Sequence, residues 1–417
     1  MRQYYLNFII STSFLTINFT FSHVALAHVK PELQSLTQML TQTESISPKA
    51  VLERLFTSQK IESEWLTPDF LAQVPIENLR QIIDELKNKL GTYESVQNNL
   101  QDYLVIFSQG SVPTKIVLNS KGQISGLFFE QPQIKFMSLE EATNKFQELP
   151  GKVSFLVQEG KTIQAALNTK MPLAVGSAFK LAVLKALKSE IASGKRTWKD
   201  VVQLQPNWKS LPSGVLQTWP DGTYLTLQTL AAFMISISDN TATDILINLI
   251  GRESIELLSL RNRPFLTTRE FFLLKSSQNE NFLQRYRTSN EAERRAILKE
   301  LSKKPLPDAS EFGGGNPVAL DIEWFFTAEE LCGLIEQVAD LPLLTINPGV
   351  AKAQDWQRIA FKGGSETGVF NMTTWLQGKN GKNYCVVATW NNSDAAVEES
   401  KFMALYSGVL AKLADNK

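Results

Sequence analysis

The stretch AVGSAFKLAVL, from Ala174 to Leu184, decides how the rest of this sequence is interpreted. A short apolar run meets a glycine and then Ser177, after which the pattern predicts an apolar helix to about Ala192. Ser177 and Lys180 are three residues apart, so on a helix they share a face and the amine can approach the hydroxyl. Because apolar surroundings disfavour a charged lysine, this pair reads as a general base beside a nucleophile. The alternative is a serine that caps a helix and a lysine that points to solvent.

Histidine is nearly absent from this chain of 417 residues, which contains only His23 and His28. Ser-His-Asp and Cys-His catalysis are excluded, because the first histidine lies in a predicted leader and the second lies beside the resulting N-terminus. Metal sites built on histidine are nearly excluded for the same reason. If Ser177 is a nucleophile, Lys180 has to act as its base, and we expect neither a metal nor a cofactor.

Residues 1–27 have the pattern of a secretory signal peptide. Arg2 is their one charged residue, an apolar stretch follows, and Ala25-Leu26-Ala27 forms a small-x-small cleavage site. The alternative, an uncleaved membrane anchor, is disfavoured because the apolar run is short and interrupted by polar residues. We therefore expect a secreted or periplasmic protein with no membrane span in the mature chain.

The overall charge and the cysteines exclude fewer classes of function than the lack of histidine does. A formal net charge of zero argues against nucleic acid as a partner, because phosphate binding needs a basic surplus. An exported protein could pair Cys332 with Cys385, but two buried free thiols fit the sequence equally well. The pairing stays open at this point.

The periodicity of the apolar residues divides the mature chain into two predicted domains. Residues 28–135 are expected to form a small α+β domain, with a helix over 76–90 followed by strands over 103–107, 114–118 and 124–129. The order of these elements resembles the cone-shaped ketosteroid-isomerase-like domains, which by itself says little about function. Residues 138–417 are expected to form an α+β domain, an antiparallel sheet flanked by helices. Its strands are predicted at 152–158, 162–167, 369–376 and 384–390, before a final helix over 397–413.

Three short motifs occur in a fixed order within the second domain. They are Ser177-x-x-Lys180, Ser238-Asp239-Asn240 between two apolar helices, and Lys362-Gly363-Gly364 leading into a strand. Separately, the second could merely cap a helix and the third could be a plain turn. Together they resemble the serine β-lactamase and penicillin-binding-protein superfamily, in its class A-like form. The order of the domains is also similar to two-domain lactamase-like proteins such as that of the clavulanic acid gene cluster.

This resemblance implies roles for individual residues. Ser177 would attack a carbonyl carbon, Lys180 would take its proton, and Ser238 would relay a proton to the leaving group. The implied substrate is a small amide or ester, such as a β-lactam, or a peptidoglycan-like molecule. Further binding groups would be the Asn240 amide, the Lys362 amine for a carboxylate, and the oxyanion-hole N–H groups of Ser177 and Ser365, beside Gly364.

The sequence departs from the superfamily pattern in two places. The strand motif lacks the hydroxyl that usually helps to bind a carboxylate, although Ser365 or Thr367 could replace it. The Glu-x-x-Leu-Asn loop that activates the deacylating water is also missing, and its nearest candidate, Glu270, has the context of a salt-bridged surface residue. We therefore expect a serine hydrolase such as an esterase, a D,D-peptidase or a slow lactamase. The alternatives are a penicillin-binding or sensor protein without turnover and, less favoured given the intact motifs, a structural protein with a dead site.

Overall fold

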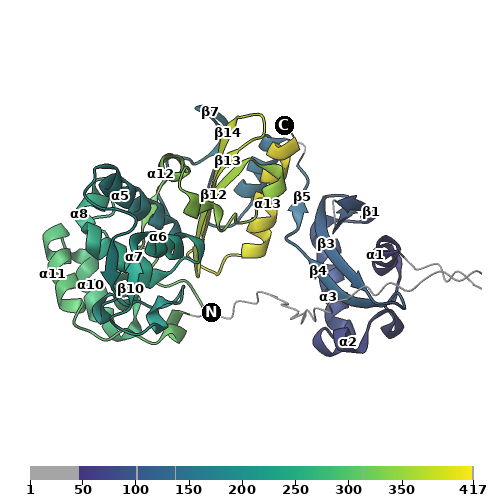
Figure 1. Ribbon diagram of the computed structural model, residues 1–417, viewed down its shortest axis with the longest axis horizontal. Coiled ribbons are helices and arrows are strands. Elements are labelled where there is room, and N and C mark those ends of the chain that lie inside the picture. The colour runs from purple at the N-terminus through teal and green to yellow at the C-terminus, as the bar shows by residue number, and fades with distance from the viewer. Residues whose placement is uncertain (1–46, 100–101, 137, 313, 416–417) are drawn as a thin grey trace, which may run out of the picture.

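The computed structural model describes residues 47–99, 102–136, 138–312 and 314–415 (Figure 1). An N-terminal unit of helices and strands lies beside a larger body, in which a group of helices packs against a second sheet. The predicted signal peptide, residues 1–27, lies outside the described residues. Within the described ranges, no helix is both long and apolar enough to cross a membrane.

The N-terminal unit, residues 48–134, is the small α+β structure that its periodicity predicts. Helix α3 ends at Gly91, whose φ of 83° favours glycine. Strand β1 was not predicted, because its sequence YESVQNN offers little apolar alternation. The resemblance to isomerase-like cones and the exact domain boundaries remain predictions. The elements are α1 (Pro48–Thr57), α2 (Pro68–Gln73), α3 (Ile76–Leu90), β1 (Tyr93–Asn99), β2 (Asp102–Phe107), β3 (Gly110–Leu118), β4 (Ile124–Phe129) and β5 (Gln133–Ile134).

The larger body is built on a five-stranded antiparallel sheet in the order β12-β13-β14-β6-β7. Strands from both ends of this part of the chain pair within it, as the sequence predicts. Helices α4 (Leu139–Gln147) and α13 (Glu399–Asp415) cover one face, and α5 (Lys180–Ala192) and α12 (Ala328–Val338) cover the other. The strands are β6 (Lys152–Glu159), β7 (Thr162–Leu167), β12 (Arg358–Glu366), β13 (Val369–Gln377) and β14 (Asn383–Asn391).

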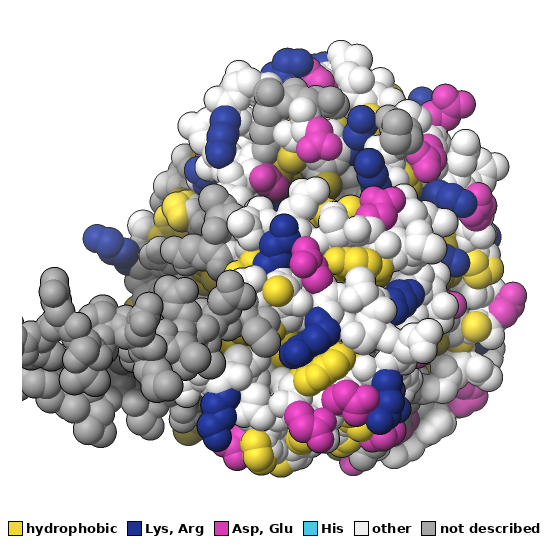
Figure 2. Space-filling model, turned by 90° about the vertical axis from the view of Figure 1, so that its right-hand side faces the viewer, with side chains coloured by type: hydrophobic (Ala, Val, Ile, Leu, Met, Phe, Trp, Pro, Cys, Tyr) yellow, Lys and Arg dark blue, Asp and Glu magenta, His cyan; other side chains and the backbone are white. Residues whose placement is uncertain are grey.

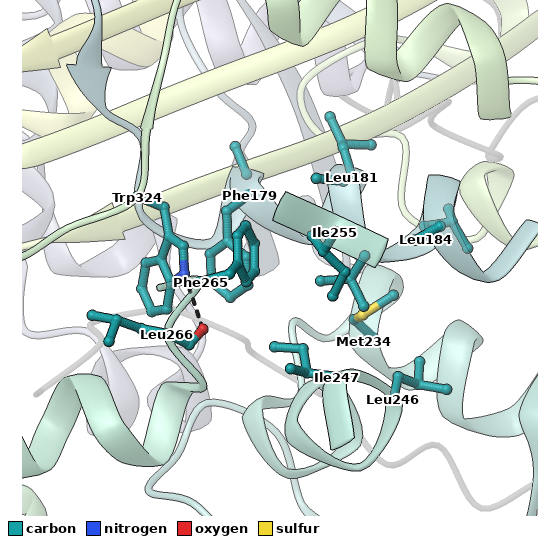
Figure 3. Close-up of a cluster of buried hydrophobic side chains, with 14 of the residues drawn as sticks. Phe179, Leu181, Leu184, Met234, Leu246, Ile247, Ile255, Phe265, Leu266 and Trp324 are labelled. Carbon is teal, nitrogen blue, oxygen red and sulfur yellow. Dashed lines mark hydrogen bonds between the residues drawn. The ribbon is translucent and has the colours of Figure 1, made fainter. Parts of the chain in front are cut away.

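The helical group surrounds α5, which is buried on nearly all sides and therefore carries apolar residues around most of its circumference. Just before it, the Phe179 ring stacks on Trp324 with the ring centroids 3.8 Å apart (Figure 3). The Trp324 indole N–H donates to the carbonyl oxygen of Leu266 at 3.1 Å. This packing holds the Ser177 turn against the core. The other helices are α6 (Leu227–Ser236), α7 (Asn240–Ile250), α8 (Arg252–Glu256), α9 (Thr268–Lys275), α10 (Glu280–Thr288) and α11 (Glu291–Leu301).

The structure shows the pairing of the cysteines and the distribution of charge on one face. Cys332 of α12 and Cys385 of β14 form a disulfide, with their Cα atoms 5.9 Å apart. On the face turned to the viewer in Figure 2, acidic and basic side chains of the described residues are interspersed. The disulfide decides between the two alternatives for the cysteines.

Candidate active site

Ser177 lies in a single 3-10 turn, Gly176–Phe179, between strand β8 (Leu173–Ala174) and helix α5. Strand β8 pairs with β11 (Phe325–Phe326), which anchors the start of the turn. Gly176 has a φ of 48°, and a Cβ there would lie 3.0 Å from the backbone nitrogen of Ser365. Only glycine fits this position without strain. The turn therefore places Ser177 beside strand β12.

The Ser238-Asp239-Asn240 motif both caps a helix and contributes to the site. Asp239 is the N-cap of α7, and its carboxylate also accepts from the backbone N–H of Val215 at 2.6 Å. Ser238 has a φ of 56°, a conformation that residues other than glycine rarely adopt. The prediction that this motif caps a helix is thus correct for Asp239. Its hydrogen bonds also hold the neighbouring residues Ser238 and Asn240 in place.

The structure brings Lys180, Ser238, Asn240 and Lys362 together. The Lys180 amine lies 2.7 Å from the Ser238 carbonyl oxygen, 3.1 Å from Ser238 Oγ and 2.7 Å from Asn240 Oδ1. The Lys362 amine lies 3.2 Å from the same Ser238 Oγ. The hydroxyl of Ser238 therefore lies between two lysine amines, one from each of the other motifs.

Both lysines are buried, and burial weakens their hold on a proton. Burial, and then the like charge of Lys362, lower the pKa of Lys180 well below its ordinary value. Burial also lowers the pKa of Lys362 to about 7. A neutral Lys180 can accept a hydrogen bond from the Ser238 hydroxyl while it donates to the two other oxygens. The arrangement thus favours the neutral form of Lys180, which can act as a base.

Ser177 and Lys180 do not hydrogen-bond to each other within the described part of the chain. All three polar contacts of the Lys180 amine go to Ser238 and Asn240. A hydrogen bond between nucleophile and base is often completed only in the substrate complex. That the Lys180 amine can reach the Ser177 hydroxyl stays a prediction, and the sequence does not reveal the partners that the amine has in the structure.

The backbone of β12 passes directly against the Ser177 turn at Gly364. A Cβ at Gly364 would lie 2.4 Å from the Ser177 nitrogen and 2.3 Å from the Val175 carbonyl oxygen. The N–H groups of Ser177 and Ser365 consequently belong to adjoining backbone segments, as an oxyanion hole requires. Gly364 is the residue that permits this close approach.

These residues open onto one pocket with a volume of about 820 Å³. Lys180 lies behind the pocket wall and is fully buried. In the part of the chain that the structure describes, no three His, Cys, Asp or Glu side chains lie close enough together to hold a metal ion. The predicted site residues that line the pocket are Ser177, Ser238, Asn240, Lys362, Gly364 and Ser365.

Residues 138–295 match the family described as "Beta-lactamase enzyme family". This segment is therefore similar to the serine β-lactamases. The matched range begins at helix α4 and contains the first two motifs, whereas the third motif follows it on β12. The body built on the five-stranded sheet is called the lactamase-like domain below.

Several solved structures are similar to this chain at low sequence identity. A β-lactamase from Sphaerobacter thermophilus DSM 20745 is 21% identical, with 67% of this chain and 96% of that chain covered at a TM-score of 0.47. A protein described as PBP-A is 13% identical, with 69% of this chain and 99% of that chain covered at a TM-score of 0.45. A β-lactamase from Chitinophaga pinensis DSM 2588 is 17% identical, with 66% of this chain and 96% of that chain covered at a TM-score of 0.43. A comparison with curated proteins found no match.

Glu270 of the lactamase-like domain differs in part from its sequence-based expectation. Its carboxylate pairs with Arg252 at 2.8 Å, which confirms the salt bridge. The expected surface position is wrong, because the residue is only 7% exposed. It occupies the N3 position of α9, where a capping box with Thr267 draws the carboxylate back toward the helix start.

An ion-paired cluster that the sequence did not reveal lines the same pocket. The Lys275 amine lies 2.7 Å from Glu366 Oε1 and 3.4 Å from Glu323 Oε1. Burial and the neighbouring Glu366 raise the pKa of Glu323 well above its ordinary value. The three residues come from distant parts of the chain, so no local pattern links them. In the lactamase-like domain they form a buried polar cluster at the pocket wall.

Lys275→Met is expected to destabilise the protein by about 3–5 kcal/mol, because it leaves the buried Glu323 carboxyl group and the partly buried Glu366 carboxyl group without their cation. The side chains of Lys275 and Glu323 are 2% and 0% exposed, so water cannot take over the lysine's role. The free energy of unfolding in urea measures the effect. Lys161→Met is the matched control, since the pair of Lys161 with Glu336 is exposed and its loss should change little. Equal stability of Lys275→Met and wild type would contradict the prediction.

Proposed function

We propose that this protein is an exported serine hydrolase that forms an acyl-enzyme on Ser177 of its lactamase-like domain, with Lys180 as the base. The observation that carries the proposal is the Ser238 hydroxyl, 3.1 Å from the Lys180 amine and 3.2 Å from the Lys362 amine. Export rests on the predicted signal peptide alone.

The proposed reaction begins when Ser177 Oγ attacks the substrate carbonyl carbon and its proton passes to Lys180. The developing negative charge on the carbonyl oxygen would be stabilised by the N–H groups of Ser177 and Ser365. The proton would then pass from Lys180 through Ser238 to the leaving nitrogen or oxygen as its bond to the acyl carbon breaks. Water would finally cleave the acyl ester and restore the Ser177 hydroxyl.

Asn240 has a less direct part in this scheme than its motif implies. Its Oδ1 accepts from Lys180, and its Nδ2 donates to the Leu211 carbonyl oxygen at 3.1 Å. Binding a substrate amide would require one of these contacts to break. We propose that Asn240 chiefly orients Lys180 and that it contacts substrate only after such an exchange.

Carboxylate-bearing substrates should bind less well as the pH rises through the pKa of Lys362, which is about 7. Below that pH the amine is charged and attracts the carboxylate, and above it the amine is neutral. We expect the KM of a carboxylate-bearing cephalosporin to rise between about pH 6 and about pH 8. The KM of uncharged p-nitrophenyl acetate is the reference. If the ratio of the two KM values does not change, Lys362 does not bind the carboxylate.

The test of the proposed function combines turnover with intact mass. The full chain is incubated with a chromogenic cephalosporin and with p-nitrophenyl acetate, and product formation is followed by absorbance. The intact mass of the protein is then measured by mass spectrometry. Turnover of either compound supports the hydrolase. A stable adduct without turnover supports instead a penicillin-binding or sensor protein, which the missing loop glutamate favours. Absence of both product and adduct would rule out the two alternatives together.

A further inference from the structure

One wall of the Ser177 pocket comes from outside the lactamase-like domain. Phe128 of β4 and Gln131, which follows it, line the same pocket as Ser177 and Lys362. Phe128 is 41% exposed, an unusual state for a phenylalanine, since large apolar side chains are normally buried. The N-terminal unit therefore extends the site with a partly exposed aromatic ring.

The N-terminal unit contacts helix α13 of the lactamase-like domain on both sides of residue 133. Figure 1 shows β5 beside α13, and a Cβ at Gly408 of α13 would lie 2.2 Å from the Ile134 carbonyl oxygen. Gln131 Nε2 also donates to the Ser400 carbonyl oxygen at 3.3 Å. The two backbones thus touch directly, and α13 in turn packs on the sheet that carries Lys362.

The position of this wall corresponds to the leaving-group side of the proposed reaction. Asn347 Nδ2 donates to the Ser236 carbonyl oxygen at 3.0 Å, so the 347–350 loop lies next to the turn that carries Ser238. Gly349 and Val350 of that loop line the pocket, and together with Gln131 they line a second adjoining cavity. The loop therefore bridges the N-terminal wall and the residue that would protonate the leaving group.

A second exposed apolar side chain lines the pocket next to Ser238 in the chain. Ile237 directly precedes Ser238, is 44% exposed and lines the pocket. The cationic group nearby, Lys362, is turned inward, where it donates to the Gly363 carbonyl oxygen and contacts Ser238. Apolar area exposed in a pocket gains about 25 cal/mol per Å² when a ligand covers it. This side of the pocket is thus suited to an apolar group.

We propose that Phe128 and Ile237 form an apolar subsite for the leaving group, so that preferred substrates are esters or amides of an alkyl- or aryl-bearing alcohol or amine. The inference rests on the proposed hydrolase function. In the step concerned, the bond between the acyl carbon and the leaving oxygen or nitrogen breaks, and that atom takes the proton from Ser238. The N-terminal unit would then select substrates without taking part in bond cleavage.

The experiment compares phenyl, 4-propylphenyl and 4-hexylphenyl acetate, which form the same acetyl-enzyme and release phenols of similar acidity. For the wild type, kcat/KM is expected to rise about tenfold or more from the first ester to the last. Phe128→Ala and Ile237→Ala are each expected to remove most of that rise, and to lower kcat/KM for phenyl acetate much less than for 4-hexylphenyl acetate. Because the two residues belong to different elements, misfolding of one variant would not affect the other.

Val117→Ala is the matched control, since Val117 is an exposed apolar residue on β3 of the same N-terminal sheet and does not line the pocket. It should retain the full chain-length dependence. Ser177-dependent hydrolysis of all three esters at equal kcat/KM, or an unchanged rise in both alanine variants, would overturn the subsite and leave the hydrolase proposal intact. Absence of any Ser177-dependent hydrolysis would overturn the proposed function and the subsite with it.

Discussion

Ser177→Ala should abolish both turnover and covalent labelling, lowering the rate of hydrolysis by about 10⁴-fold or more. Under the proposed mechanism, Ser177 Oγ is the atom that receives the acyl group, and the Ser177 backbone nitrogen lies against Gly364. The change should leave the fold intact, because the Ser177 side chain makes no hydrogen bond that helps to hold the described structure together. The measurements are p-nitrophenyl acetate hydrolysis, intact mass after incubation with a penicillin, and the melting temperature.

Ser236→Ala provides the control for Ser177→Ala. Ser236 lines the same pocket, but its hydroxyl donates to the Ala232 carbonyl oxygen within α6. Its variant should label and turn over like the wild type. If Ser177→Ala kept an adduct or a substantial rate of turnover, the nucleophile would have to be another residue.

Lys180→Met should slow acylation by about 10²–10⁴-fold, the usual contribution of a general base. Methionine fills a similar volume but cannot accept a proton from Ser177 or donate to Ser238 and Asn240. Stability should fall as well, by about 1–3 kcal/mol for each buried acceptor left unpaired. The burst phase of p-nitrophenyl ester hydrolysis isolates acylation from the later steps.

The pH dependence of the acylation rate shows whether Lys180→Met removes a base or only a structural contact. Because burial lowers the pKa of Lys180, the wild-type acylation rate should rise with pH as the amine loses its proton. The variant should lack that rise. Stability follows the same sign: between the lowered folded-state pKa and 10.5, the unfolded state binds more protons, so stability increases with pH. Lys180→Met should lose this increase too.

Lys185→Met is the matched control for Lys180→Met, since Lys185 lies on the same helix and contributes no side chain to the pocket. Its acylation rate and pH profile should match those of the wild type. A Lys180→Met variant with a normal burst would show that another group removes the proton from Ser177.

Several parts of the fold could be predicted because their information is local. The spacing of leucine and isoleucine predicts α3, and Gly91 predicts its end. The alternation and runs of valine predict β6 and β14, and the capping box at Thr327 predicts α12. Strand β1 could not be predicted, because Val96 is its single buried apolar residue and the strand is held by pairing with β2.

In the candidate site, too, local features could be predicted from the sequence and long-range contacts could not. The three motifs and their order were visible in the sequence, and the lack of histidine directed attention to Lys180 as the base. The environment of Glu270 was misjudged, because its burial depends on Arg252 and on the way α9 packs. The Lys275 cluster was invisible, because Glu323 and Glu366 lie 48 and 91 residues away in the chain.

The sequence alone determined which chemistry is available: a serine three residues before a lysine, two partner motifs, and a superfamily that uses them. These properties depend on residue type and short spacing, which a helix or turn converts directly into position. Only the tertiary structure decided that the Lys180 amine contacts Ser238 and Asn240, that Gly364 fits against Ser177, and that Phe128 reaches the pocket. Each of these contacts joins segments far apart in the chain, and their meeting is set by the packing of α5, β12 and α13 around the shared sheet.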